Sequence, residues 1–115
     1  MRIVVPRETA PGEQRVALVP ESCKKLIRAG YEIAIEAGAG KAAGFTDLAY
    51  RDAGAAAESD PAALIASGDL VLKVNAPATG RARDEVSWMR PGTIYLGSLM
   101  PLVRIEREGA LWRLV

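Results

Sequence analysis

The segment IEAGAGKAAGF contains a spacing that could bind a dinucleotide. Gly38, Gly40 and Ala43 fit the pattern G-x-G-x-x-A, and a strand-like apolar run precedes them. In a dinucleotide-binding turn the first glycine makes the bend, the second lets the pyrophosphate approach, and the third small residue packs the helix against the sheet. Glu58 stands where an acidic side chain could bind the ribose. The alternative is a turn whose glycines only permit positive φ angles.

Two features of this segment favour the structural alternative. A dinucleotide-binding helix begins inside the glycine run, whereas Gly44 and a cap at Thr46 indicate that this helix begins after it. The strand that would present Glu58 contains three alanines, which are poor strand residues. A phosphate-binding P-loop is excluded because Ala42 follows Lys41 where serine or threonine is required. We therefore expect no cofactor-binding residue in this chain.

Two cationic side chains are better candidates for ligand contact. Arg15 ends the loop after the first strand, where a guanidinium could bind a carboxylate or phosphate bidentately. A solvated surface arginine is the alternative. Lys73 interrupts the apolar run DLVLKVNAP near the carboxyl end of a strand, where open α/β sheets bind ligands. Its ammonium either contacts a ligand in a partly buried site or extends to water.

The absence of histidine narrows the chemistry further. The 115 residues include no histidine and a single cysteine, Cys23. Ser-His-Asp and Cys-His catalytic arrangements and Cys/His zinc sites cannot form within such a chain. We expect neither a catalytic residue nor a metal ligand. Cys23 lies on the apolar face of a helix and is interpreted as a small buried residue.

Charge and hydropathy exclude other classes of partner. The formal net charge is +1, with both signs spread along the chain. This balance predicts no nucleic-acid partner. The apolar runs are far too short to span a bilayer, so we expect no direct membrane insertion. A lone cysteine indicates a reducing compartment.

Alternating strand and helix patterns must position the candidate residues. Strand patterns cover residues 2–5, 31–36, 55–58, 69–74 and 93–96. Helices are expected after Pro20, after caps at Thr46 and Asp60, and over 82–89, where Ala82, Val86 and Met89 have helical spacing. The second helix is expected to bury Leu48, Ala49 and Ala53. The alternation predicts a single three-layer α/β domain with a mostly parallel, Rossmann-like or flavodoxin-like sheet.

A family resemblance covers nearly the whole chain. The sequence is similar to the amino-terminal domain shared by alanine dehydrogenases and the alpha subunit of proton-translocating NAD(P) transhydrogenase, over IVVPRETAPGEQRVALVPESCKKLIRAGYEIAIEAGAGKAAGFTDLAYRDAGA. The segments DLVLKVNAP and MRPGTIYLGSLMP continue the resemblance in the same order. We therefore expect this amino-terminal domain over residues 1–102 and a divergent carboxyl-terminal tail over 103–115.

The resemblance implies roles for particular residues. Arg15 and Lys73 match the arginine and lysine that hold the substrate carboxylate in alanine dehydrogenases. The family's catalytic histidine is expected after the strand TIYLGSL, but Gly97 and Ser98 stand in that region. The chain therefore looks more like the transhydrogenase alpha subunit, whose second domain binds NAD(H) and exchanges hydride with NADP(H) on a partner subunit. On this interpretation the chain lacks the NAD-binding domain, binds no cofactor alone and is inactive alone.

The same resemblance implies partners and a location. The intact subunit is a dimer, so we expect a homo-oligomer and contacts with other transhydrogenase domains or subunits. The expected location is cytoplasmic, or peripheral to the inner membrane through partner subunits. One alternative is a stand-alone module that binds small carboxylates, or an alanine-dehydrogenase-like fragment. Another is a structural or dimerisation fragment, indicated by Leu111, Trp112 and Leu114 in the tail.

Overall fold

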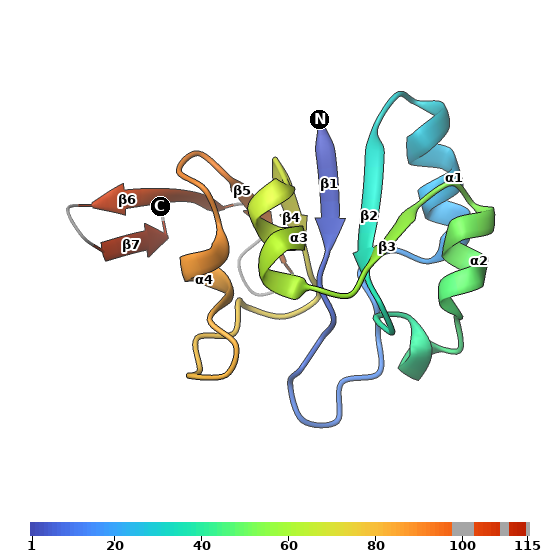
Figure 1. Ribbon diagram of the computed structural model, residues 1–115. Helices are drawn as coiled ribbons and strands as arrows, with labels where there is room; N and C mark the ends of the chain where they lie inside the picture. The colour runs from blue at the N-terminus through green and yellow to red at the C-terminus, as the bar shows by residue number, and fades with distance from the viewer. Residues whose placement is uncertain (98–102, 109–110, 115) are drawn as a thin grey trace.

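The computed structural model describes residues 1–97, 103–108 and 111–114, with the last two segments described as backbone. Strands and helices alternate along the chain (Figure 1). In chain order they are β1 (Arg2–Val5), α1 (Pro20–Arg28), β2 (Glu32–Glu36), the 3-10 helix η1 (Lys41–Ala43), α2 (Asp47–Asp52), β3 (Ala56–Glu58), α3 (Pro61–Ser67), β4 (Leu70–Leu72), α4 (Glu85–Trp88), β5 (Ile94–Leu96), β6 (Val103–Glu108) and β7 (Leu111–Leu114).

The described strands form one sheet in the order β3-β2-β1-β4-β5-β6-β7. β3, β2, β1, β4 and β5 are mutually parallel, whereas β6 pairs antiparallel with β5, and β7 with β6. Val4 of the central strand β1 lies between Ala34 of β2 and Val71 of β4. The predicted α/β class and mostly parallel sheet are confirmed.

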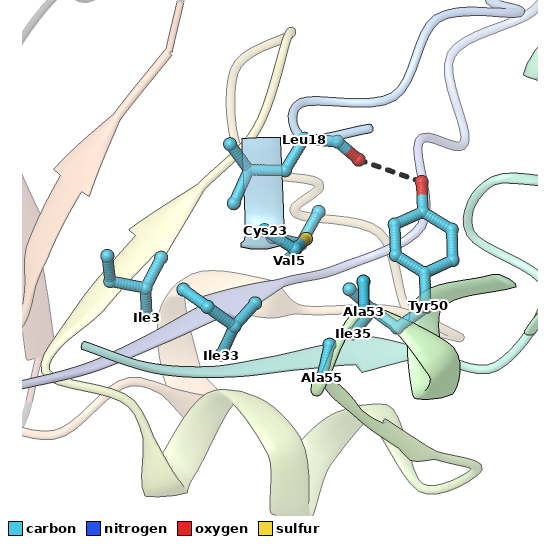
Figure 2. Close-up of a cluster of buried hydrophobic side chains, with 9 residues drawn as sticks. All are labelled: Ile3, Val5, Leu18, Cys23, Ile33, Ile35, Tyr50, Ala53 and Ala55. Carbon is cyan, nitrogen blue, oxygen red and sulfur yellow. Dashed lines mark hydrogen bonds between the residues drawn. The ribbon is translucent and has the colours of Figure 1, made fainter. Parts of the chain in front are cut away.

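Two apolar clusters lie on opposite faces of the sheet. Successive strand side chains point to opposite faces, so Ile3 and Val5 of β1 enter one cluster and Val4 enters the other. The first cluster packs against α1 and α2 and includes Cys23, which is fully buried as predicted (Figure 2). The second packs against α3 and includes Leu64 and Ile65. These clusters make the predicted three layers.

Helix α2 buries a different face from the one predicted. Thr46 caps the helix as expected, because its side-chain oxygen accepts a hydrogen bond from the Ala49 amide. Leu48, however, is 62% exposed, while Tyr50 and Ala53 are buried. The Tyr50 hydroxyl donates a 2.7 Å hydrogen bond to the Leu18 carbonyl (Figure 2). The large ring takes the core position that the sequence pattern assigned to Leu48.

The helix predicted over 82–89 is shorter and buries an unexpected side chain. α4 begins after Asp84, whose carboxylate accepts the Ser87 amide, and it ends at Trp88. Met89 is buried as expected, whereas Ala82 is exposed. Glu85 is completely buried. The spacing of apolar residues therefore missed the fact that a carboxylate faces inward here. Among the described residues, no helix has the length and apolar character needed to cross a bilayer.

Candidate functional site

Polar side chains meet where the central strands end. β1 is followed by Arg7 and Glu8, β2 ends in Glu36, and β4 is followed by Lys73 and Asn75. Because β1, β2 and β4 are parallel neighbours, their carboxyl ends lie at one edge of the sheet. Ligands of open α/β sheets bind at this edge, where the strand order changes direction.

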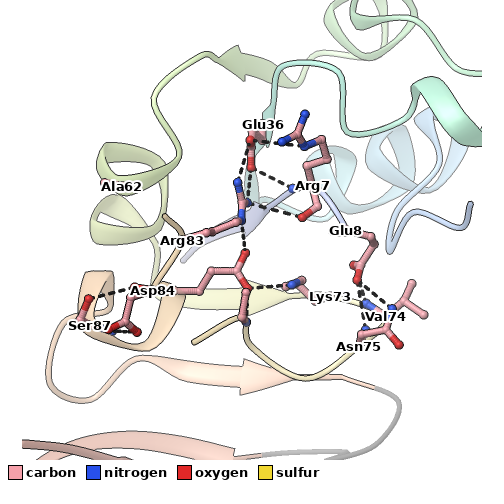
Figure 3. A network of polar contacts seen from close by, with 12 residues as sticks. Arg7, Glu8, Glu36, Ala62, Lys73, Val74, Asn75, Arg83, Asp84 and Ser87 are labelled. Atoms are coloured by element: carbon pink, nitrogen blue, oxygen red, sulfur yellow. Dashed lines mark hydrogen bonds and ion pairs between the residues drawn. The ribbon is translucent and has the colours of Figure 1, made fainter. Parts of the chain in front are cut away.

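Glu8 holds the loop after β4 against the loop after β1. Its carboxylate accepts hydrogen bonds from the Val74 amide at 2.8 Å, the Asn75 amide at 3.2 Å and the Asn75 Nδ2 at 3.3 Å (Figure 3). The Asn75 carbonyl in turn accepts a hydrogen bond from the Tyr95 hydroxyl, whose pKa is raised by burial. β4 consequently ends at Leu72 rather than at residue 74 as predicted, since these amides bind Glu8.

Lys73 is the first member of a chain of ion pairs. Its side chain is 2% exposed, and its Nζ lies 2.7 Å from Oε1 of the fully buried Glu85. The other oxygen of Glu85 accepts a 2.8 Å hydrogen bond from Arg83 Nε. Arg83 Nη2 then lies 2.5 Å from Glu36 Oε1. Figure 3 shows Lys73, Arg83 and Glu36 along this network, which joins β4, the loop before α4 and β2.

The charges in this chain compensate one another. Two cations, Lys73 and Arg83, alternate with two carboxylates, Glu85 and Glu36. Burial raises the pKa of Glu36, but hydrogen bonds from Arg83 and from the Arg7 amide outweigh that effect, so the net pKa is below its usual value. Burial lowers the pKa of Arg83, and its bonds to the two carboxylates more than reverse that effect. The network is fixed in its ionised form.

Arg15 has the opposite environment. Its side chain is 70% exposed, and Nε and Nη2 donate hydrogen bonds of 2.9 and 2.8 Å to the two oxygens of Glu13. Oε1 of Glu13 also accepts a 2.9 Å hydrogen bond from Asn75 Nδ2. The bonds from Arg15 hold the pKa of Glu13 well below its usual range, and those same bonds raise the pKa of Arg15.

The two predicted site residues lie in neighbouring but separate networks. Among the described residues, no hydrogen bond or ion pair joins Arg15 to Lys73, and each has its own carboxylate partner. Lys73 follows neither predicted alternative, because its ammonium is buried on Glu85. Sequence reasoning missed Glu85 and Arg83. The available signal was Lys73 itself, since a lysine within a buried strand requires a carboxylate partner.

A cleft of about 460 Å³ opens beside Arg15, within the size range of small-molecule sites. It lies between the loop after β1 and the loop after β2. Lys73 is not among its lining residues, which are Arg7, Glu8, Glu13, Arg15, Gly38, Ala39, Lys41 and Ala42. Within the described portion of the chain, no cluster of acidic, cysteine or histidine side chains is arranged to hold a metal ion.

The glycines of the G-x-G-x-x-A segment have structural roles. A Cβ on Gly40 would lie 2.5 Å from the ring of Tyr50. Gly38 and Gly44 have φ angles of +82° and +90°, which side chains disfavour. The Gly38 amide donates to the Asp47 carboxylate at 2.9 Å and is engaged there. As predicted, α2 begins after the glycine run, at Asp47.

A parallel sheet of this order, with polar groups at its carboxyl edge, defines a Rossmann-like α/β domain. The chain belongs to the family of the alanine dehydrogenase/PNT amino-terminal domain, whose family model matches residues 4–113. This match extends beyond residue 102 into the segment that contains β6 and β7. The predicted family is thereby confirmed.

Relatives come from both branches of the family. The chain is 42% identical over 103 residues to the first of the parts that make up NAD(P) transhydrogenase subunit alpha of Rhodospirillum rubrum, covering 86% of this chain and 27% of the relative. It is 42% identical over 77 residues to an alanine dehydrogenase of Halomonas elongata, covering 67% of this chain and 21% of the relative.

Solved structures agree. A transhydrogenase from Sinorhizobium meliloti superposes with a TM-score of 0.76 at 34% identity, covering 84% of this chain and 27% of that chain. An L-alanine dehydrogenase gives a TM-score of 0.76 at 35% identity, covering 84% and 26%. The chain thus spans about a quarter of the length of these relatives.

Proposed function

We propose that this chain serves as the amino-terminal domain of an NAD(P) transhydrogenase alpha subunit. The observation that carries the proposal is the 42% identity to the Rhodospirillum rubrum subunit over most of the chain. The lack of histidine supports it, because the resemblance assigns a catalytic histidine to alanine dehydrogenases. The intact enzyme would transfer hydride between NAD(H) and NADP(H), coupled to proton translocation.

In this proposal the domain supports catalysis that takes place elsewhere. The compensated chain from Lys73 to Glu36 supports a structural role, since Lys73 is buried on Glu85 and directs no free charge at a ligand. The NAD-binding domain is supplied by another segment or chain, and this polypeptide alone binds no cofactor. We further propose a dimer in contact with other transhydrogenase domains, located in the cytoplasm or on the inner membrane through partner subunits.

A domain exchange tests the proposal directly. This chain would replace the corresponding amino-terminal segment of the Rhodospirillum rubrum subunit, and hydride exchange between NAD(H) and NADP(H) would be assayed with the remaining partners present. We expect the chimera to retain transhydrogenation and to show no oxidation of alanine. Loss of transhydrogenation in a chimera that remains folded, or the appearance of alanine oxidation, contradicts the proposal.

A titration tests whether the domain lacks its own NAD site. Calorimetry of NAD against the isolated polypeptide should detect no binding, or binding far weaker than micromolar. A micromolar Kd, which corresponds to roughly −8 kcal/mol, would contradict this aspect of the proposal. The same titration on the chimera supplies the positive control.

A stand-alone carboxylate-binding module is the second candidate, favoured by the cleft beside Arg15. Calorimetry with pyruvate and alanine, repeated on Arg15→Ala and Lys73→Ala, tests it. Binding that neither substitution weakens would remove this candidate. The third, a dimerisation fragment, rests on side chains of the 111–114 segment, which lie outside the described side chains. Sedimentation of the chain with and without this segment tests it, and a monomer in both would contradict it.

A further inference from the structure

A second cleft adjoins the one beside Arg15. Its volume is about 560 Å³, and it shares Gly38 and Lys41 with the first cleft. Its remaining lining residues come from the start of α2 and the turn before it, namely Gly44, Phe45, Thr46, Asp47 and Leu48. The two clefts therefore meet at Lys41, with different side chains on either side.

The first cleft carries an uncompensated positive charge. Three cations line it, Arg7, Arg15 and Lys41, against the two carboxylates of Glu8 and Glu13. Both carboxylates already accept several hydrogen bonds from the protein. Lys41 is exposed, and no ion pair or hydrogen bond within the described portion of the chain engages its ammonium. This end of the groove can accept one negative charge.

The second cleft presents apolar surface. Leu48 is 62% exposed, which makes it one of three exposed large hydrophobic side chains among the described residues, with Met1 and Tyr31. Phe45 is half-buried, and its ring meets Tyr50 edge to face at a centroid distance of 6.5 Å. Tyr50 is fixed in the core, so Phe45 rests on a rigid base. An apolar group placed here would cover Leu48 and Phe45 together.

We propose that the two clefts bind an amphiphilic monocarboxylate. Its carboxylate lies at Lys41 and Arg15, and its apolar chain lies over Phe45 and Leu48. The charge excess selects a single negative charge, and the combined clefts exceed the volume that a two- or three-carbon acid needs. The site does not include Lys73. It goes beyond the proposed transhydrogenase function, since it requires neither NAD nor a second domain.

A series of straight-chain acids tests the proposal. Acetate, butanoate, hexanoate and octanoate are titrated into the chain by calorimetry, with hexan-1-ol as the probe that lacks the charge. Affinity should rise by up to about fourfold for each methylene that is buried. Acetate and hexan-1-ol should bind far more weakly than hexanoate. An affinity independent of chain length, or equal binding of the alcohol and the acid, overturns the proposal.

Matched variants locate the site. Lys41→Ala should weaken octanoate binding about tenfold or more, as loss of a charge-assisted hydrogen bond would. Leu48→Ser should remove most of the chain-length dependence while leaving the charge requirement. Lys25→Ala and Tyr31→Ser are the controls, because they remove an exposed charge and an exposed hydrophobic side chain elsewhere. Unchanged octanoate affinity in Lys41→Ala overturns the proposal.

A second copy of this chain is the rival occupant of the apolar cleft. Sedimentation of the wild type and Leu48→Ser distinguishes the two, and the carboxylate proposal predicts the same oligomeric state for both. Self-association that Leu48→Ser abolishes and octanoate does not disturb overturns it. NAD titration is unaffected by any of these outcomes, so failure here and failure of the transhydrogenase proposal are separate results.

Discussion

Lys73 and Arg15 are both cations near the carboxyl ends of the central strands, yet their surroundings are opposite. The Lys73 side chain is 2% exposed and its partner Glu85 is completely buried. The Arg15 side chain is 70% exposed beside Glu13. Removing one member of a buried pair leaves a charge without solvent, whereas water replaces the partner of an exposed one. Similar ion pairs therefore differ in function: the buried pair stabilises the fold, and the exposed pair leaves its cation available to a ligand.

Glu85→Ala should break the comparison on its buried side most severely. It leaves both Lys73 and Arg83 without the carboxylate that they share. We expect a loss of about 3–5 kcal/mol in the free energy of unfolding, measured by urea denaturation. The double variant Lys73→Met with Glu85→Leu should recover much of this loss, since it removes both charges. A loss below about 1 kcal/mol in Glu85→Ala would show that water reaches this network.

Gly40→Ala sharpens the comparison on the exposed side. The 38–42 loop lines the cleft, but a Cβ on Gly40 would meet the ring of Tyr50 at 2.5 Å. Because this ring is fully buried, we expect a loss of about 1–3 kcal/mol. Gly80→Ala is the control, since its nearest contact is at 4.0 Å. Equal melting temperatures for the two variants would show that the cleft wall yields easily.

Acid titration separates the two regions by a different property. The pKa of Glu36 is lowered from 4.5 in the folded state, so its contribution to stability is present above that pH and is lost as pH falls through the lowered value. Between pH 6 and 8 stability should be flat, because the chain has no histidine. Urea midpoints of Glu36→Gln should therefore depend less on pH below 4.5 than those of wild type. Parallel profiles would contradict this assignment.

Arg15→Ala should have the smallest effect on stability. The pair with Glu13 is exposed and spans only two residues, so we expect a change within about 0.5 kcal/mol. Thermal unfolding measures it, and Lys25→Ala provides a matched loss of an exposed cation. A loss above about 1.5 kcal/mol would place Arg15 in the structural network and would end the contrast with Lys73.

The fold could be predicted further from the sequence than the site could. Strand and helix patterns are local, so they predicted the parallel sheet, and the caps at Thr46 and Asp60 identified where two helices begin. The errors arose where tertiary contacts decided the outcome. Leu48 matched an apolar pattern, but the larger ring of Tyr50 occupies the core.

The candidate site depends on pairings between distant residues. Lys73 was identified from its place in an apolar strand, but its partner Glu85 is twelve positions away and belongs to another element. Helical spacing assigned the inward face of that element to Ala82, Val86 and Met89. Only the folded chain shows that Glu85 takes an inward position, and that the final partner in the network comes from β2.

The central position of β1 has a consequence for the order of folding. β1 pairs with β2 through a connection that begins near the amino terminus, with Val5 opposite Ile35. Its other neighbour, β4, pairs Ile3 with Leu70, so the chain between these residues forms a much longer loop. Closing a longer loop costs more entropy, and contacts distant in sequence form more slowly. The sheet should therefore grow from β1 and β2 outward, with the polar edge that joins β4 to them assembled late and exchanging its amide hydrogens sooner.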